Sequence, residues 1–186
     1  MIILASASPR RQEIFKNAGY EFDLCPMDID EEKIQADSKE ELVMALAKAK
    51  AVACKEYKKN SLTDEDMIVG ADTLVFANSR RLGKPESKEQ WKEFIKMLQG
   101  DVHEVITGVC VLHGCEEKCF YSTTKVTVAP MTEDDIDRYI ALGEDMDKAG
   151  GYAIQGYFAQ YIPQIEGEYN NVVGFPIAKF RGEMKK

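Results

Sequence analysis

The sequence predicts a single α/β domain, because short apolar runs typical of buried strands alternate with segments of helical periodicity. Ile2–Ala5 and Met67–Phe76 are two such apolar runs, and a long amphipathic segment beginning at Ser38 lies between them. The chain has 186 residues, which is long enough to bury one full core. We therefore expect one domain that spans residues 1–186.

The composition excludes several classes of protein. A net charge of −8 argues against a nucleic-acid partner, because a polynucleotide backbone requires a broad basic surface. No apolar run approaches the roughly 20 residues that a membrane-spanning helix needs. No basic segment precedes the first apolar run, so a signal peptide is not expected either. These features predict a cytoplasmic protein without membrane contact, whose phosphorylated ligand, if it has one, is a small molecule.

The N-terminal strand leads directly into a helix that has the features of an anion site. Ser8 suits the N-cap and Pro9 the first helical position, while Ser6 lies in the turn. Arg10 and Arg11 follow in the first helical turn, where cations oppose the helix dipole unless something negative compensates them. A bound phosphate would do so. The alternative is a surface helix whose arginines pair with Asp or Glu, and these residues alone leave both open.

A second strand, Tyr20–Cys25, is predicted next, followed by the carboxylate-dense loop Pro26–Glu32. Such a loop is either simply solvated or a magnesium site, since hard cations bind carboxylate oxygens. The helix beyond it begins with a capping box of Ser38 and Glu41. Its predicted buried face consists of Leu42, Ala45, Leu46, Ala49, Val52 and Ala53.

Asp72 interrupts the apolar run Met67–Phe76, which otherwise reads as a central strand. Aspartate is disfavoured in strands, and an unpaired buried charge is costly. The residue either marks a turn or bulge at 70–72, or is a carboxylate near a strand end that binds metal or activates water. We favour the second interpretation because β-branched residues flank the aspartate.

The remaining elements follow the same reasoning. We expect the loop Arg80–Pro85 containing Lys84, a helix from Ser87 to Gly100, the hairpin strands Val105–Leu112 and Cys119–Val128, a helix capped by Thr132, glycine-rich loops at 147–156 and 167–176, and a short polar C-terminal helix. The glycines of the first loop allow its backbone to approach a ligand closely. His103 is expected to be structural rather than catalytic.

Five cysteines in a chain expected to be cytoplasmic predict no disulfide. A zinc site is an alternative, formed by Cys110, His113, Cys115 and Cys119. Paired Cys-x2-Cys spacings are missing, however, so buried thiols in a hairpin explain these residues better.

Taken together, these stretches resemble the Maf family of nucleoside triphosphate pyrophosphatases, which were first associated with inhibition of septum formation. The resemblance runs over the whole chain. It is carried by the motifs Leu4–Arg11, Asp30-Glu31, Ala49-Lys50-Ala51, Gly70–Thr73, Gly83-Lys84-Pro85, His103 with Thr107-Gly108, Asp147–Gly150, Ile154-Gln155-Gly156 and Asn171–Gly174.

The resemblance implies a Maf/HAM1-like (ITPase-like) α/β fold, with an elongated, twisted mixed sheet flanked by helices and two lobes around a cleft. It implies hydrolysis of the α–β phosphoanhydride of dTTP and UTP, giving a monophosphate and pyrophosphate. The implied cofactor is a divalent cation, Mg²⁺ or Mn²⁺, held by Glu31 and Asp72, with Glu31 preferred to Glu32.

Each site residue also takes an expected role from this resemblance. Asp72 would be the proton acceptor, and Glu31, Lys50 and Lys84 would complete the catalytic set. The residues expected to bind substrate are Ser6, Ser8, Arg10, Arg11, Thr73, Lys148 and Gln155, of which Arg11, Thr73 and Gln155 match positions linked to substrate choice. Uracil and thymine share a carbonyl–NH–carbonyl edge that Gln155 and the glycine loop are expected to pair with.

Three other interpretations remain open from the sequence. The chain is alternatively a housecleaning enzyme for modified pyrimidine triphosphates, a non-catalytic nucleotide-binding regulator of cell division, or a zinc-stabilised interaction protein. The sequence also leaves open whether the chain is a monomer or a homodimer.

Overall fold

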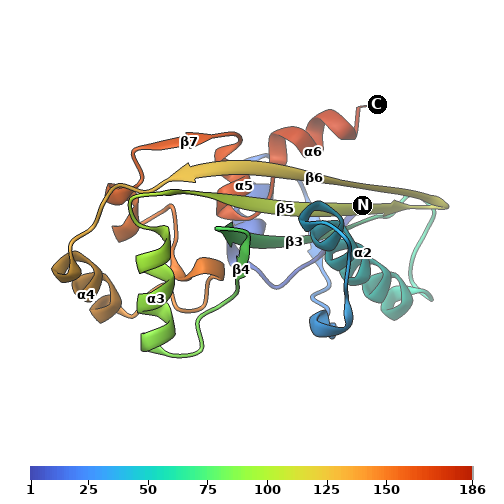
Figure 1. Cartoon of the computed structure of the whole chain (residues 1–186). Coiled ribbons are helices and arrows are strands. Elements are labelled where there is room, and N and C mark those ends of the chain that lie inside the picture. The colour runs from blue at the N-terminus through green and yellow to red at the C-terminus, as the bar shows by residue number, and fades with distance from the viewer. Residues whose placement is uncertain (186) are drawn as a thin grey trace. The chain divides into compact units, whose positions relative to one another are not determined.

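The computed structural model describes residues 1–185, and Figure 1 shows how the chain runs through its elements. Its strands are β1 (Ile2–Ala5), β2 (Phe22–Leu24), β3 (Met67–Ala77), β4 (Arg80–Leu82), β5 (Val102–His113), β6 (Glu116–Thr127) and β7 (Gln164–Glu166). The α-helices are α1 (Pro9–Asn17), α2 (Lys39–Lys58), α3 (Lys88–Leu98), α4 (Glu133–Leu142), α5 (Tyr169–Val173) and α6 (Ile177–Glu183). Single 3₁₀ turns occur at Glu31–Lys33, Ala149–Gly151 and Tyr157–Tyr161.

The strands within residues 1–185 form one seven-stranded sheet in the order β2-β1-β3-β5-β6-β7, with β4 paired to β3. β1 pairs in parallel with both β2 and β3, whereas β4 on β3 and β7 on β6 are antiparallel. The predicted mixed sheet flanked by helices is therefore confirmed. β4 and β7 were not expected from the sequence. The predicted cleft between two lobes stays a prediction.

The chain divides into two compact units, each made of discontinuous segments. The first unit contains residues 1–73, 107–122 and the segment from 174 onward, and the second contains residues 74–106 and 123–173. The expectation that the whole chain forms one domain stays a prediction.

In the first unit, α2 lies unusually close to the sheet at two glycines. A Cβ atom on Gly70 would lie 2.2 Å from the carbonyl oxygen of Ala47, and one on Gly108 would lie 2.2 Å from that of Val43. The buried face of α2 is Val43, Leu46, Ala47, Ala51 and Cys54. Of the face expected from the sequence only Leu46 is fully buried, whereas Val52 is exposed and the other four residues are half-buried. The glycines of the sheet select which small residues of this alanine-rich helix are buried.

Helices α1 and α6 cover the other face of this part of the sheet. Ile68 and Gly70 face α2, so the alternation of side chains along a strand turns Thr73 toward α1, with which it is hydrogen-bonded. An aromatic cluster of Phe15 from α1 with Phe175 and Phe180 packs there, with ring centroids 4.7 to 5.8 Å apart. The predicted N-cap Ser8 and first helical residue Pro9 of α1 are confirmed.

In the second unit, α3 and α4 pack against each other through Trp91 and Tyr139, both fully buried. Their predicted caps are confirmed: Ser87 accepts from the backbone of Gln90, and Thr132 forms a reciprocal capping box with Asp135. His103 is buried in the same core, with its Nε2 2.5 Å from the hydroxyl of Tyr152. Burial lowers the pKa of His103 to about 4, although Asp101 opposes the shift. These contacts agree with the structural role expected for His103.

Cys110 and Cys119 form a disulfide across the β5–β6 hairpin, so the expectation of no disulfide was wrong. The two residues lie opposite each other, with Cα atoms 4.1 Å apart, because the turn at Gly114-Cys115 lies midway between them. Cys110 and Cys119 are bonded to each other, so neither is available as a zinc thiolate.

None of the helices within residues 1–185 is both long enough and apolar enough to cross a bilayer.

Replacing Gly70 by alanine is expected to destabilise the protein by about 2 to 3 kcal/mol, because the new methyl group would overlap the backbone of α2. Gly182→Ala in α6 is the control, since no atom of the described residues 1–185 lies within 4 Å of its added Cβ. Chemical unfolding of both variants measures the difference. Equal stability of the two variants would contradict the close approach of α2.

Acidification should destabilise the protein through His103. The folded state resists protonation of this side chain, whereas the unfolded chain takes up the proton near its ordinary pKa of 6.5. The free energy of unfolding therefore falls by about 3 kcal/mol as the pH drops from 6.5 toward 4.

His103→Gln should remove this part of the pH dependence of unfolding, and His113→Gln, which replaces an exposed histidine, should retain it. Urea unfolding between pH 7 and 4.5 tests this. The same slope in wild type and His103→Gln would show that His103 is not the group responsible.

Candidate active site

Asp72, Lys50 and Glu31 form a compact charged cluster in the first unit. Asp72 lies in the middle of β3 and is 6% exposed, so it is neither in a turn nor at the strand end that the sequence suggested. The ammonium of Lys50, on α2, lies 2.5 Å from Asp72 Oδ1 and 2.8 Å from Glu31 Oε1. Lys50 therefore compensates the buried charge of Asp72 and connects it to the acidic loop.

The second oxygen of Asp72 gives this cluster the character of a cation site. Asp72 Oδ2 is buried and has no hydrogen-bond partner within residues 1–185. An ionised carboxylate oxygen without a donor is costly unless a ligand or ion compensates it. Two carboxylates together with substrate phosphates are a common ligand set for Mg²⁺. Asp72 and Glu31 therefore fit a divalent cation, which would also satisfy the buried oxygen.

Arg11 is the centre of a second cluster, on the opposite face of β3. Its Nε donates to the carbonyl of Gly174 at 2.8 Å, one Nη to Ser6 Oγ at 3.2 Å, and the other Nη to Thr73 Oγ1 at 3.0 Å. Three of the five guanidinium N–H groups are thus used to hold the side chain in place. One N–H on each Nη remains for a ligand.

The charged groups of the two clusters interact electrostatically. Burial lowers the pKa of Arg11, and Arg10 lowers it further, whereas the negative charges of Asp72 and Glu31 raise it. An arginine with three hydrogen bonds and nearby carboxylates remains charged at neutral pH. The first unit therefore contains buried charges of both signs within electrostatic reach of one another.

The start of α1 completes this part of the site. The Ser8 side chain accepts from the backbone N–H of Arg11, and the Ser8 backbone N–H donates to Ser6 Oγ at 3.2 Å. The first turn of α1 contains no acidic residue, and Arg10 is half-buried there. The helix start therefore provides N–H groups and cationic charge without a competing carboxylate in its first turn, which suits an anion site.

Three predicted site residues belong to the second unit. Lys84 and Gln155 are exposed, and the loop of Lys84 is held by a bond of 2.9 Å from the Gly150 N–H to the Gly83 carbonyl. The ammonium of Lys148 contacts Asp147 at 2.7 Å, Asp145 at 3.1 Å and the Glu144 carbonyl at 3.3 Å. Lys148 is thus engaged by its own loop and would have to exchange exposed Asp147 for a phosphate. A common pocket for these residues and those of the first unit stays a prediction.

Sequence reasoning gave no role to two groups that hold Arg11 in place. Thr107 lies 2.9 Å from Thr73, hydroxyl to hydroxyl, and the Gly174 carbonyl accepts from both Arg11 and Thr73. Gly174 has a φ of +135°, a conformation that favours glycine and aims its carbonyl at the cluster. The only local signals were two glycine-containing motifs, which do not reveal these contacts.

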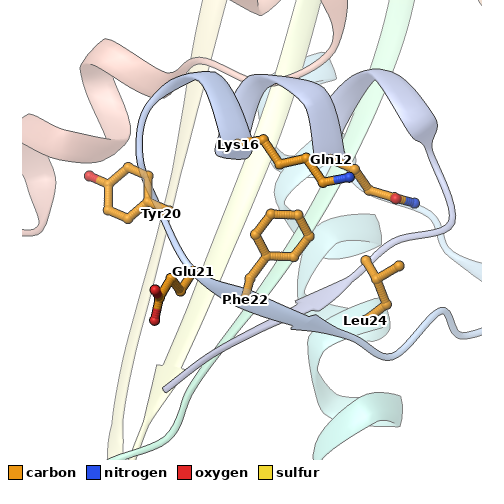
Figure 2. Close-up of a pocket in the computed structure, with 6 residues that line it drawn as sticks. All are labelled: Gln12, Lys16, Tyr20, Glu21, Phe22 and Leu24. Atoms are coloured by element: carbon orange, nitrogen blue, oxygen red, sulfur yellow. The ribbon is translucent and has the colours of Figure 1, made fainter.

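A hollow of about 380 Å³ lies elsewhere in the first unit, between α1 and β2. Figure 2 shows its lining residues: Gln12, Lys16, Tyr20, Glu21, Phe22 and Leu24. None of them belongs to the predicted site. With a single lysine and a single glutamate, the hollow has no convergent set of charges for a triphosphate or a metal ion.

The chain matches the family model described as Maf-like protein over residues 1–186. A dTTP/UTP pyrophosphatase of Agathobacter rectalis is 42% identical over 198 residues, covering 100% of this chain and 96% of that protein. A dTTP/UTP pyrophosphatase of Bacillus cereus is 41% identical over 185 residues, covering 100% of this chain and 94% of that protein. Among solved structures, the Staphylococcus aureus Ham1 protein is 15% identical with a TM-score of 0.44, covering 87% of this chain and 79% of that one.

Arg11→Lys is expected to destabilise the protein by about 3 kcal/mol, because an ammonium cannot satisfy three acceptors spread around a planar guanidinium. Arg10→Lys, at a half-buried neighbour, should change the free energy of unfolding by less than about 0.5 kcal/mol. Chemical unfolding compares the two. An Arg11→Lys variant as stable as Arg10→Lys would rule out the three-acceptor arrangement.

Proposed function

This chain belongs to the Maf family, and we propose that it is a nucleoside triphosphate pyrophosphatase acting on dTTP and UTP. In the reaction, water attacks the α-phosphorus and the α–β phosphoanhydride bond breaks, leaving a nucleoside monophosphate and pyrophosphate. The observation that carries the proposal is Asp72, a carboxylate buried in a strand. One of its oxygens contacts Lys50, and the other has no donor among residues 1–185. The full-length match to the family supports it.

The residues of the first unit fit the needs of this reaction. Phosphoryl transfer depends mainly on positioning and on neutralising charge. Arg10 and the start of α1 provide donors and positive charge for phosphate oxygens. Asp72 would accept the proton of the attacking water, and Lys50 would hold that carboxylate in position while contributing charge of its own.

Glu31 and Asp72 would hold a divalent cation, Mg²⁺ or Mn²⁺, which would neutralise phosphate charge and lower the barrier for attack by water. Lys84, on a loop held by Gly150, would contribute a further cation to the phosphates. Lys148 would join it after exchanging Asp147.

Selection of the base is assigned to Gln155, Arg11 and Thr73. Gln155 is exposed and offers both an amide donor and an amide acceptor, which suits the carbonyl–NH–carbonyl edge of uracil and thymine. We further place the protein in the cytoplasm, where its nucleotide substrates occur.

The experiment is to incubate the purified protein with dTTP and UTP in the presence of Mg²⁺ or Mn²⁺ and to identify both products. We expect the monophosphate and pyrophosphate, and we expect a chelator to abolish the reaction. Nucleoside diphosphate together with single phosphate would refute the proposed bond cleavage.

Asp72→Asn should lower turnover by about a hundredfold to ten thousandfold, because the amide is neither a proton acceptor nor a strong cation ligand. Circular dichroism checks that the fold is retained. Asp64→Asn, at an exposed aspartate outside the site, is the matched control and should keep wild-type turnover. If Asp72→Asn releases pyrophosphate at the wild-type rate, Asp72 has no part in the reaction.

A further inference from the structure

We propose that Thr107 is a positioning residue for substrate choice: its buried hydroxyl fixes Thr73, and through Thr73 it fixes the guanidinium of Arg11. The inference rests on the proposed function, in which Arg11 and Thr73 contribute to selecting the base. Thr107 is 0% exposed, and its Oγ1 lies 2.9 Å from Thr73 Oγ1. It belongs to the first unit together with the groups on which it acts.

The hydroxyl of Thr73 takes part in three contacts and has one proton to give. Its oxygen accepts from Arg11 Nη2 at 3.0 Å, and its O–H donates to the Gly174 carbonyl at 3.2 Å. With that proton committed to Gly174, the contact with Thr107 is satisfied when Thr107 is the donor. Thr107 therefore favours the one rotamer of Thr73 in which a lone pair faces Arg11.

The backbone beneath Thr107 is held firmly enough to act as a support. The next residue, Gly108, lies against α2 so closely that a Cβ atom there would be 2.2 Å from the Val43 carbonyl. A strand in backbone contact with a helix cannot shift to absorb a lost hydrogen bond. Changes at Thr107 should therefore be transmitted to Thr73 and Arg11 rather than relaxed locally.

The placement of Arg11 matters because guanidinium groups only donate hydrogen bonds. Uracil and thymine have a carbonyl acceptor at C4, whereas cytosine has an amino group there. A guanidinium held at a fixed position would donate a hydrogen bond to the carbonyl of uracil or thymine. With cytosine, the same guanidinium would face an amino group, which is another donor. A loosened Arg11 could turn aside from that amino group, so discrimination against cytosine would fall.

The test compares kcat/KM for UTP with kcat/KM for CTP in the full-length, metal-loaded protein. Thr107→Val keeps the shape but removes the hydroxyl, and we expect it to lower the UTP-to-CTP ratio about tenfold. Thr107→Ser keeps the donor and should restore the ratio to within about twofold of wild type.

Thr124→Val is the matched control. Thr124 is also 0% exposed, and its hydroxyl donates to the Glu168 carbonyl at 3.0 Å and accepts from Asn171 at 3.0 Å. The Thr124→Val variant should lose stability as Thr107→Val does, but it should keep the wild-type UTP-to-CTP ratio. The control thereby separates a general loss of stability from a loss of selection.

A Thr107→Val enzyme that keeps the wild-type UTP-to-CTP ratio would overturn the inference. So would a Thr124→Val enzyme with the same change in ratio. If Thr107→Val does not fold, Thr107→Ala carries the test with the same expected fall. A wild-type protein that releases no pyrophosphate from any nucleotide refutes the proposed function itself, whereas an active wild type without preference for UTP refutes only the role of Thr107.

Discussion

The ion pair between Lys50 and Asp72 depends on how closely α2 lies against β3. Ala47 touches Gly70 through its backbone carbonyl, and this contact fixes the helix relative to the strand. Lys50 lies three residues beyond Ala47, about 4.5 Å along the helix, and Asp72 lies two residues beyond Gly70, about 6.6 Å along the strand. The same contact that packs the core therefore brings the ammonium to the carboxylate at 2.5 Å.

Because side chains alternate along β3, the two clusters lie on opposite faces of the sheet. Asp72 and Thr73 are neighbours in sequence, yet one meets the lysine of α2 and the other meets the arginine of α1. The sheet thus separates Asp72, the proposed proton acceptor and cation ligand, from the groups that hold Arg11. Charge still couples the two sets, because the field of Asp72 acts on Arg11 across the strand.

Features specified by neighbouring residues were predictable from the sequence, and features specified across the fold were not. The caps at Ser8, Ser87 and Thr132 are local and were predicted correctly. The buried face of α2 was not, because alanines occur on several sides of this helix and only the sheet glycines decide among them. Strand β7 depends likewise on a partner distant in sequence, because it pairs with Lys125–Thr127 of β6. The disulfide and β4 are exceptions to this division, because both lie within local hairpins.

The candidate site shows the same division, and burial explains it. Asp72 could be identified from the sequence because a charge inside an apolar run is anomalous. Threonine in a strand is ordinary, so the residue type of Thr107 did not indicate a role, although Thr107 lies in a motif of the family. In the structure Thr107 is fully buried, and a buried polar group must have a hydrogen-bond partner, so burial draws attention to this residue. The buried polar side chains described in the first unit are Ser6, Arg11, Asp72, Thr107 and Ser122, and all but Ser122 belong to the two clusters around β3. Polar groups are thus buried in this unit mainly where the proposed chemistry requires them.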